Sequence, residues 1–189
     1  MNTMNQAISE IGVVPVIKLN NPERDAAPLA KALCAGGVPV AEVTFRAAGA
    51  PLAIKVMKET CPDMIVGAGT VTTTAQIDEA IEAGAQFIVT PGMDEDLVKY
   101  AQEKKIAIYP GCTTPSDYHT ALKYGLEVLK FFPAEANGGV GMLKNIGAAL
   151  KGARWMCTGG VNAKNVNDYL GYDQIFAVGG TWMCKSDVI

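Results

Sequence analysis

The sequence predicts an α/β protein whose parallel strands close into a (β/α)8 barrel, with residues 1–189 in one domain. Eight short apolar segments recur along the chain, each rich in Val, Ile and Phe and several ending in Gly or Pro. Segments with helical spacing lie between them, and strict alternation of strand and helix favours a parallel sheet. An open doubly wound sheet would carry a G-x-G-x-x-G turn after its first strand, and residues 13–21 contain none.

The apolar segments are the expected strands of the barrel. They are Val13 to Lys18, Val40 to Phe45, Met64 to Thr70, Phe87 to Gly92, Ile106 to Gly111, Val128 to Ala134, Arg154 to Gly160 and Gln174 to Gly180. The sequence contains no linker or low-complexity tract. A chain of 189 residues, 49% hydrophobic and 19% charged, can bury one sizeable core. We therefore expect a single domain.

Four of the intervening helices have recognisable starts and ends. They are predicted to begin at Asn21-Pro22, Thr74, Thr114-Pro115 and Asn162, and to end near the glycines at positions 36, 84, 125 and 171. Pro28 predicts a kink or a late start in the first helix, because proline removes a helical hydrogen bond. The sequence stops at Ile189, soon after the eighth strand. Either a tail carrying the last helix is missing from it, or another subunit covers that strand.

Composition argues against several classes of function. The net charge is −3 and the basic residues are scattered, so nucleic acid is not an expected partner. The first ten residues lack a signal-peptide pattern, and no apolar run approaches the ~20 residues that span a bilayer. We therefore expect a cytoplasmic protein without a membrane partner. The five cysteines are widely spaced and odd in number, which favours reduced thiols. Neither their spacing nor the single histidine fits a metal site.

Lys130 lies in the middle of a segment that otherwise has the pattern of a buried strand. Strand alternation places Val128, Lys130 and Phe132 on one face, and both faces are otherwise apolar. Partial desolvation of a lysine favours the free amine, which is the form that attacks carbonyl carbons. A lysine near a strand end can also reach solvent or pair with a carboxylate without any chemical role.

The second strand carries three polar residues on one face. Glu42, Thr44 and Arg46 alternate with Val43 and Phe45, so the polar face is expected to point into the barrel mouth. A Glu42–Arg46 ion pair of purely structural use would have the same pattern. Together with Lys130, however, the carboxylate would supply a general acid/base beside a nucleophile, which imine chemistry requires.

Other strand ends carry groups suited to binding anions. Thr70 ends the glycine-rich third strand and could help Arg46 to bind a carboxylate. Glycine-rich turns follow the last two strands, where barrel enzymes commonly hold phosphate on backbone amides. These turns contain Thr158, Gly159, Gly160, Gly179, Gly180 and Thr181. Pro91 and Gly92 close the fourth strand, mainly as turn formers.

The chain resembles the 2-keto-3-deoxy-6-phosphogluconate (KDPG) aldolases, the KDPG/KHG family of class I aldolases, over essentially its whole length. Four segments look like that family's motifs, in the family's order. They are Glu42-Val43-Thr44-Phe45-Arg46, Val66-Gly67-Ala68-Gly69-Thr70, Lys130-Phe131-Phe132-Pro133-Ala134-Glu135 and Thr158-Gly159-Gly160. The short C-terminus departs from the family, whose members continue through a final helix.

The resemblance implies a usually trimeric barrel that reversibly cleaves KDPG to pyruvate and glyceraldehyde 3-phosphate, with no metal or dissociable cofactor. Lys130 matches the Schiff-base lysine of the family, and Glu42 matches its general acid/base. Arg46 and Thr70 match residues near the substrate carboxylate. The turns at Thr158, Gly159 and Gly160 and at Gly179, Gly180 and Thr181 correspond to the phosphate site. Thr44, Pro91 and Phe132 are expected in the same pocket.

The sequence leaves several functions open. The substrate could be 4-hydroxy-2-oxoglutarate (KHG) or the galactonate epimer of KDPG, because discrimination of one hydroxyl's orientation depends on fine pocket geometry. From other classes, a phosphate-binding barrel synthase or isomerase and a non-catalytic metabolite-binding barrel would also have affinity for phosphate. Neither of these would form a pyruvate imine that can be trapped.

Overall fold

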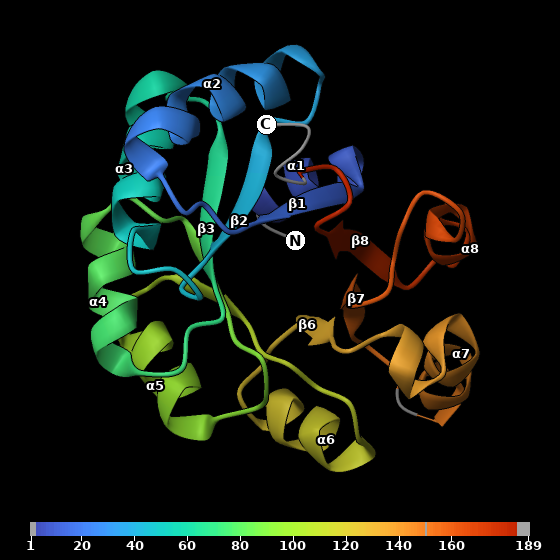
Figure 1. Ribbon diagram of the computed structural model, residues 1–189. Coiled ribbons are helices and arrows are strands. Elements are labelled where there is room, and N and C mark those ends of the chain that lie inside the picture. Colours follow the sequence, from blue (N-terminus) through green and yellow to red (C-terminus); the bar gives the residue numbers. More distant parts are fainter. Residues whose placement is uncertain (1–2, 150, 185–189) are drawn as a thin grey trace.

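The computed structural model describes residues 3–149 and 151–184, in which strands and helices alternate (Figure 1). The strands in this part of the chain are β1 (Val13–Ile17), β2 (Val40–Thr44), β3 (Ile65–Gly69), β4 (Phe87–Val89), β5 (Ala107–Tyr109), β6 (Val128–Phe131), β7 (Arg154–Thr158) and β8 (Ile175–Gly180). The helices are α1 (Thr3–Ile11), α2 (Pro22–Ala35), α3 (Ala50–Thr60), α4 (Thr74–Glu82), α5 (Glu95–Glu103), α6 (Pro115–Lys123), η1 (Glu135–Asn137), α7 (Gly139–Ala149) and α8 (Val166–Leu170). The eight strands predicted from the sequence are confirmed.

The strands form one parallel sheet in the order β5-β4-β3-β2-β1-β8-β7-β6. Its two outer strands meet just beyond β5, where Gly111 forms a parallel bridge with Lys130. The Lys130 amide donates to the Pro110 carbonyl at 2.9 Å, and the Cys112 amide donates to the Lys130 carbonyl at 2.8 Å. These bonds complete the predicted (β/α)8 barrel, and α2 to α8 lie outside the ring of strands (Figure 1).

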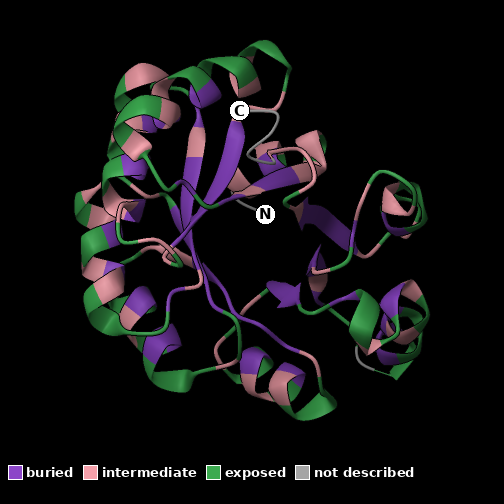
Figure 2. Ribbon diagram, in the orientation of Figure 1, coloured by how far each residue is buried: buried purple, intermediate pink, exposed green. Residues whose placement is uncertain are grey.

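Buried residues make up most of the strands and lie on the sides of the helices that face them (Figure 2). The interior cluster joins Ile8 of α1 to Val14, Val40, Phe87, Val89, Tyr109, Val128, Met156, Phe176 and Ala177 of the strands. Helix α1 covers the amino ends of the strands, since Ile8 is fully buried there and Asn5 accepts a hydrogen bond from the Tyr109 hydroxyl at 2.5 Å. This helix is not among the elements predicted from the sequence.

Three of the four predicted helix starts are close to those in the structure. The Asn21 side chain caps α2 by accepting from the Arg24 amide at 3.2 Å. Helix α4 is capped by Thr73, one residue before the predicted start, and α6 is capped by Thr114. Pro28 lies inside α2, which is one helix from its first residue onward, so a late start is wrong and the alternative, a kink at Pro28, stays a prediction.

The predicted start at Asn162 is also wrong. Helix α8 is short, and Asn165 occupies its N-cap position. Asn162 lies in the preceding loop, where its side chain donates to the Gly160 carbonyl at 2.9 Å and accepts from the Lys164 amide at 2.9 Å. An asparagine two residues after a glycine pair suits this local turn as well as it suits a helix start.

The described residues after β8 form no helix, and they end at Cys184. The sequence predicted that the final helix is missing or that another subunit covers β8. Positions 185–189 lie outside the described residues, so this stays a prediction. Within residues 3–149 and 151–184, no helix is both long and apolar enough to span a bilayer.

The capping box of α6 provides a test of local stability. Burial would raise the pKa of Asp117, but hydrogen bonds from the amides of Thr113 and Thr114 outweigh it and lower the pKa. A carboxylate with a lowered folded-state pKa adds stability above its unfolded-state pKa, and this stability is lost as the pH falls through the folded-state pKa. Asp117→Asn should reduce the free energy of unfolding by about 1 kcal/mol at neutral pH, and by less in acid.

Urea unfolding of both proteins from pH 7 down to pH 3 measures this difference. Glu82→Gln is the control, because Glu82 is exposed in the last turn of α4. A difference for Asp117→Asn that stays constant over this pH range would contradict the assigned hydrogen bonds.

Candidate active site

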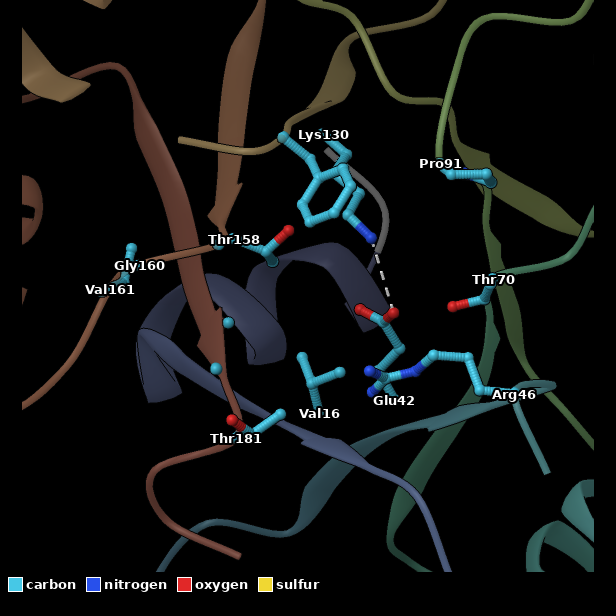
Figure 3. A pocket seen from close by; sticks show the side chains of 14 residues that line it. Val16, Glu42, Arg46, Thr70, Pro91, Lys130, Thr158, Gly160, Val161 and Thr181 are labelled. Atoms are coloured by element: carbon cyan, nitrogen blue, oxygen red, sulfur yellow. Dashed lines mark ion pairs between the residues drawn. The ribbon is translucent and has the colours of Figure 1, made fainter. Parts of the chain in front are cut away.

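A cavity of about 290 Å³ opens among the residues at the carboxyl ends of the strands (Figure 3). Its lining consists of Val16, Glu42, Arg46, Thr70, Pro91, Lys130, Phe132, Thr158, Gly159, Gly160, Val161, Gly179, Gly180 and Thr181. The structure thus brings together every site residue predicted from the sequence except Thr44. Barrel enzymes carry their functional groups at this end, because the loops after the strands converge there.

The side chains of Lys130 and Glu42 meet across the barrel. Three strands, β1, β8 and β7, lie between β2 and β6 in the sheet, so the two strands are on opposite sides of the closed barrel. Nζ of Lys130 lies 3.6 Å from Oε1 of Glu42 (Figure 3). Lys130 is 5% exposed and Glu42 is 0% exposed. Within the described residues, neither Glu42 oxygen accepts a hydrogen bond. The carboxylate therefore has unused acceptor capacity beside the amine and the cavity.

The alternation predicted for β6 is confirmed. Leu129 and Phe131 pack in the apolar layer beneath the helices, whereas Lys130 and Phe132 line the cavity. Nζ of Lys130 lies 4.9 Å from the centre of the Phe132 ring. The aromatic face attracts the ammonium, and it also gives the amine a partly apolar surrounding.

Gly69 at the end of β3 provides the space that Glu42 occupies. An added Cβ at Gly69 would lie 2.1 Å from Oε1 of Glu42 and 2.5 Å from its Cγ. Any larger residue would therefore collide with the carboxylate. The sequence pattern suggested only a glycine-rich strand end, because a contact between neighbouring strands cannot be recognised before their register is known.

Thr44 supports Arg46 from outside the cavity lining. Its hydroxyl donates to the Ile17 carbonyl at 2.9 Å and accepts from Nε of Arg46 at 3.1 Å. The predicted place of Thr44 in the pocket is therefore corrected to a place behind it. The ion pairs of the described residues join Glu42 to Lys130 and do not include a Glu42–Arg46 pair. The guanidinium of Arg46 reaches into the cavity (Figure 3).

Thr70 has an unusual backbone conformation at the cavity wall. Its φ is 56°, in the left-handed region that β-branched residues rarely adopt. The conformation costs of the order of 1–2 kcal/mol, and strain of this kind is concentrated at functional sites. The Thr70 hydroxyl points into the cavity on the same side as Arg46 (Figure 3).

The turn after β7 exposes two backbone donors to the cavity. Gly159 and Gly160 both have left-handed φ values, 93° and 86°. Their amides, and that of Thr181 after β8, donate to no protein acceptor in the part of the chain that is described. Adjacent unpaired amides form a concave anion site. The Thr158 hydroxyl beside them is buried and also lacks a partner among the described residues.

A protein-family model described as KDPG and KHG aldolase matches residues 4–189. The chain belongs to this family. The resemblance inferred from the sequence motifs is thereby confirmed. A 2-dehydro-3-deoxy-phosphogluconate aldolase of Dickeya dadantii (strain 3937) is 47% identical over 177 residues, which are 94% of this chain and 83% of that protein.

Two solved aldolase structures have the same fold as this family member. The KDPG aldolase of Zymomonas mobilis ZM4 with 3-phosphoglycerate has a TM-score of 0.93 and 40% identity, covering 98% of this chain and 88% of that one. The KDPG aldolase of Legionella pneumophila, with pyruvate captured at low pH as a covalent carbinolamine intermediate, has a TM-score of 0.93 and 37% identity. That match covers 99% of this chain and 90% of the other.

The cysteines of this aldolase-family chain are free thiols in the described residues, as the sequence suggested. Burial raises the pKa of Cys112 to about 12 and also raises the pKa of Cys157 above its ordinary range. Both therefore stay protonated at neutral pH and make poor nucleophiles. The described part of the chain contains no group of three or more His, Cys, Asp or Glu residues that could hold a metal ion.

The contact at Gly69 predicts a sensitive site in this family member. Gly69→Ala should displace the Glu42 carboxylate and lower the free energy of unfolding by about 1–3 kcal/mol, as overpacking does. Gly92→Ala is the matched control, because an added Cβ there meets nothing within 4 Å and its φ is not left-handed. Urea unfolding and aldolase assays of both variants would compare them. Equal effects of the two substitutions would contradict the close contact between Gly69 and the Glu42 carboxylate.

Proposed function

We propose that this protein is a class I aldolase that cleaves KDPG to pyruvate and glyceraldehyde 3-phosphate through a Schiff base on Lys130. One observation carries the proposal: a buried lysine faces a buried carboxylate at 3.6 Å inside the cavity. Lys130 is also the one lysine that is buried among the described residues. An amine and a proton-transfer group in contact are what imine formation needs.

In the first half of the reaction, the free amine of Lys130 adds to the C2 keto carbon and forms a carbinolamine. Two protons reach the C2 oxygen through Glu42: the one that the attacking nitrogen loses, and the one that Glu42 took from the Lys130 ammonium to free the amine. The oxygen then leaves as water, an iminium remains, and Glu42 is again a carboxylate. Glu42, directly or through water, then removes the proton of the C4 hydroxyl. The C3–C4 electron pair becomes the C2–C3 double bond while the π pair of the iminium moves to nitrogen, so glyceraldehyde 3-phosphate leaves and a pyruvate enamine remains.

In the second half, Glu42 returns a proton to C3 of the enamine and restores an iminium. Water adds to C2, and loss of the amine releases pyruvate and regenerates Lys130. Neither oxygen of Glu42 accepts a hydrogen bond within the described residues, so both are available to the substrate and to water in these steps.

The two ends of the substrate would bind at different walls of the cavity. Arg46 and Thr70 would hold the carboxylate next to the reacting carbon, and the amides of Gly159, Gly160 and Thr181 would hold the phosphate. The remaining lining residues at Thr158, Gly179, Gly180, Pro91 and Phe132 would shape the space between these ends. Binding of the distant phosphate helps to orient C2 toward the amine.

KHG is the alternative substrate, because the matching family includes aldolases for both compounds. KHG carries a second carboxylate where KDPG has a longer phosphorylated chain. The amides of Gly159, Gly160 and Thr181, which donate to no acceptor among the described residues, favour the phosphorylated substrate. The galactonate epimer of KDPG would use the same groups. Assembly as a homotrimer remains an expectation from the family resemblance, and a cytoplasmic location remains an expectation from the sequence pattern.

Reduction with borohydride in the presence of pyruvate tests the role of Lys130. The imine should be trapped as a secondary amine, and peptide mapping should locate it on Lys130 alone. Lys130→Met should remove the adduct, whereas Lys144→Met, on an exposed face of α7, should retain it. An adduct on another lysine, or none at all, would exclude the mechanism.

Replacement of Glu42 tests the proton-transfer role. Glu42→Gln keeps the size of the side chain and should lower kcat for KDPG cleavage by roughly 10²–10⁴, the usual contribution of general acid/base help. Circular dichroism should show that the variant is folded. Cleavage at nearly the unmodified rate would remove Glu42 from the reaction.

A further inference from the structure

Glu135 and Tyr169 lie behind the glycine turn that follows β7, and neither lines the reaction cavity. Glu135 begins η1, the short helix after the Lys130 strand, and Tyr169 belongs to α8. Both border a second cavity of about 390 Å³. Glu135 touches the turn from outside and Tyr169 touches Glu135, and the reaction proposed above assigns neither residue a role.

The main chain at Ala134 and Glu135 sets the direction of the two glycine amides. The Ala134 amide donates to the Thr158 carbonyl at 2.8 Å, and the Glu135 amide donates to the Gly159 carbonyl at 3.0 Å. In a trans peptide, the carbonyl and the following N–H point in opposite directions. Fixing these two carbonyls toward η1 therefore turns the Gly159 and Gly160 amides away from η1.

The side chain of Glu135 supports the same turn. An added Cβ at Gly160 would lie 2.5 Å from Cγ and 2.6 Å from Cβ of Glu135, so the Glu135 stem packs directly against the Gly160 backbone. The other side of this residue is held by Asn162 and Asn165, whose side chains donate to the Gly160 carbonyl at 2.9 Å and 3.2 Å. The turn is thus held at three carbonyls, those of Thr158, Gly159 and Gly160, and at the Cα of Gly160.

Tyr169 holds Glu135 in this position. Its hydroxyl donates to Oε1 of Glu135, and the Tyr169 residue is 1% exposed. Burial, together with the Glu135 carboxylate, raises the pKa of Tyr169, so its hydroxyl stays protonated as a donor at neutral pH. Gly139 leaves room for the pair, since an added Cβ there would lie 3.0 Å from Oε1 of Glu135 and 3.2 Å from the Tyr169 hydroxyl.

We propose that Glu135, held by Tyr169, is a positioning residue that makes the active site selective for phosphorylated substrates by orienting the Gly159 and Gly160 amides. This inference rests on the proposed function, which places the substrate phosphate at those amides. The lysine chemistry at the other end of the cavity does not require Glu135. Its loss should therefore weaken binding of the phosphate while leaving imine formation with pyruvate intact.

The test compares three reactions of the full-length protein: cleavage of KDPG, cleavage of KHG, and exchange of the pyruvate methyl protons in D2O followed by NMR. Glu135→Ala removes the stem and the partner of Tyr169. It should raise KM for KDPG about tenfold, which corresponds to about 1.4 kcal/mol, without changing KM for KHG or the exchange rate. Glu135→Gln keeps the stem and an acceptor oxygen, so it should behave like the unmodified protein.

Tyr169→Phe removes only the hydrogen bond and should give a smaller rise in KM for KDPG. Asp168→Ala is the matched control, because Asp168 borders the same outer cavity and is exposed. Retained pyruvate exchange shows that each variant is folded and that Lys130 is intact. Equal KM values for KDPG in Glu135→Ala and Asp168→Ala would overturn the inference.

A parallel loss of pyruvate exchange in Glu135→Ala would also overturn it, because Glu135 would then support the lysine strand generally. Failure of the proposed function would look different. The unmodified protein would then show no pyruvate exchange, or it would bind KDPG no better than KHG. Either result would be visible before any substitution is compared.

Discussion

The ion pair between Lys130 and Glu42 spans the mouth of the barrel and places two buried charges where the surrounding layers are apolar. Burial of charge is costly, and the attraction between the partners offsets it only when both are held in place. Here the two residues come from β2 and β6, which face each other across the barrel, so the pair exists only if the barrel closes. Closure is completed at Lys130 itself, whose backbone bonds to Pro110 and Cys112.

Several features follow from the need to hold this pair. Helix α1 covers the amino ends of the strands, and the cavity that holds the pair lies at their carboxyl ends. Gly69 leaves the volume that the Glu42 carboxylate fills, and Phe132 covers one side of the Lys130 amine. Glu42 retains acceptor capacity that a purely structural ion pair would have satisfied with further hydrogen bonds. The arrangement suits proton transfer better than it suits stability.

The anion-binding walls of the cavity depend on unusual backbone conformations. Thr70 adopts a left-handed φ despite its branched side chain, and Gly159 and Gly160 adopt consecutive left-handed values. Each conformation is held by neighbouring elements, because an isolated chain would relax. At the glycine turn, part of the support comes from Ala134 and Glu135 in the segment that follows Lys130, and the rest comes from Asn162 and Asn165. The amine and the turn that would bind phosphate are thus parts of one connected structure.

The sequence by itself determined the eight strands and three of the helix starts, and it singled out Lys130 and Glu42 as candidates for the nucleophile and the proton-transfer group, since strand alternation and glycine turns are local patterns. It could not show that Glu42 pairs with Lys130 and not with Arg46, because that choice depends on distances across the closed barrel. Thr44 behind the cavity, α1 beneath it, and the contacts of Gly69 and Glu135 were likewise decided by tertiary structure. Each of these depends on which backbone atoms approach closely, and a linear pattern carries no information about such contacts between distant segments.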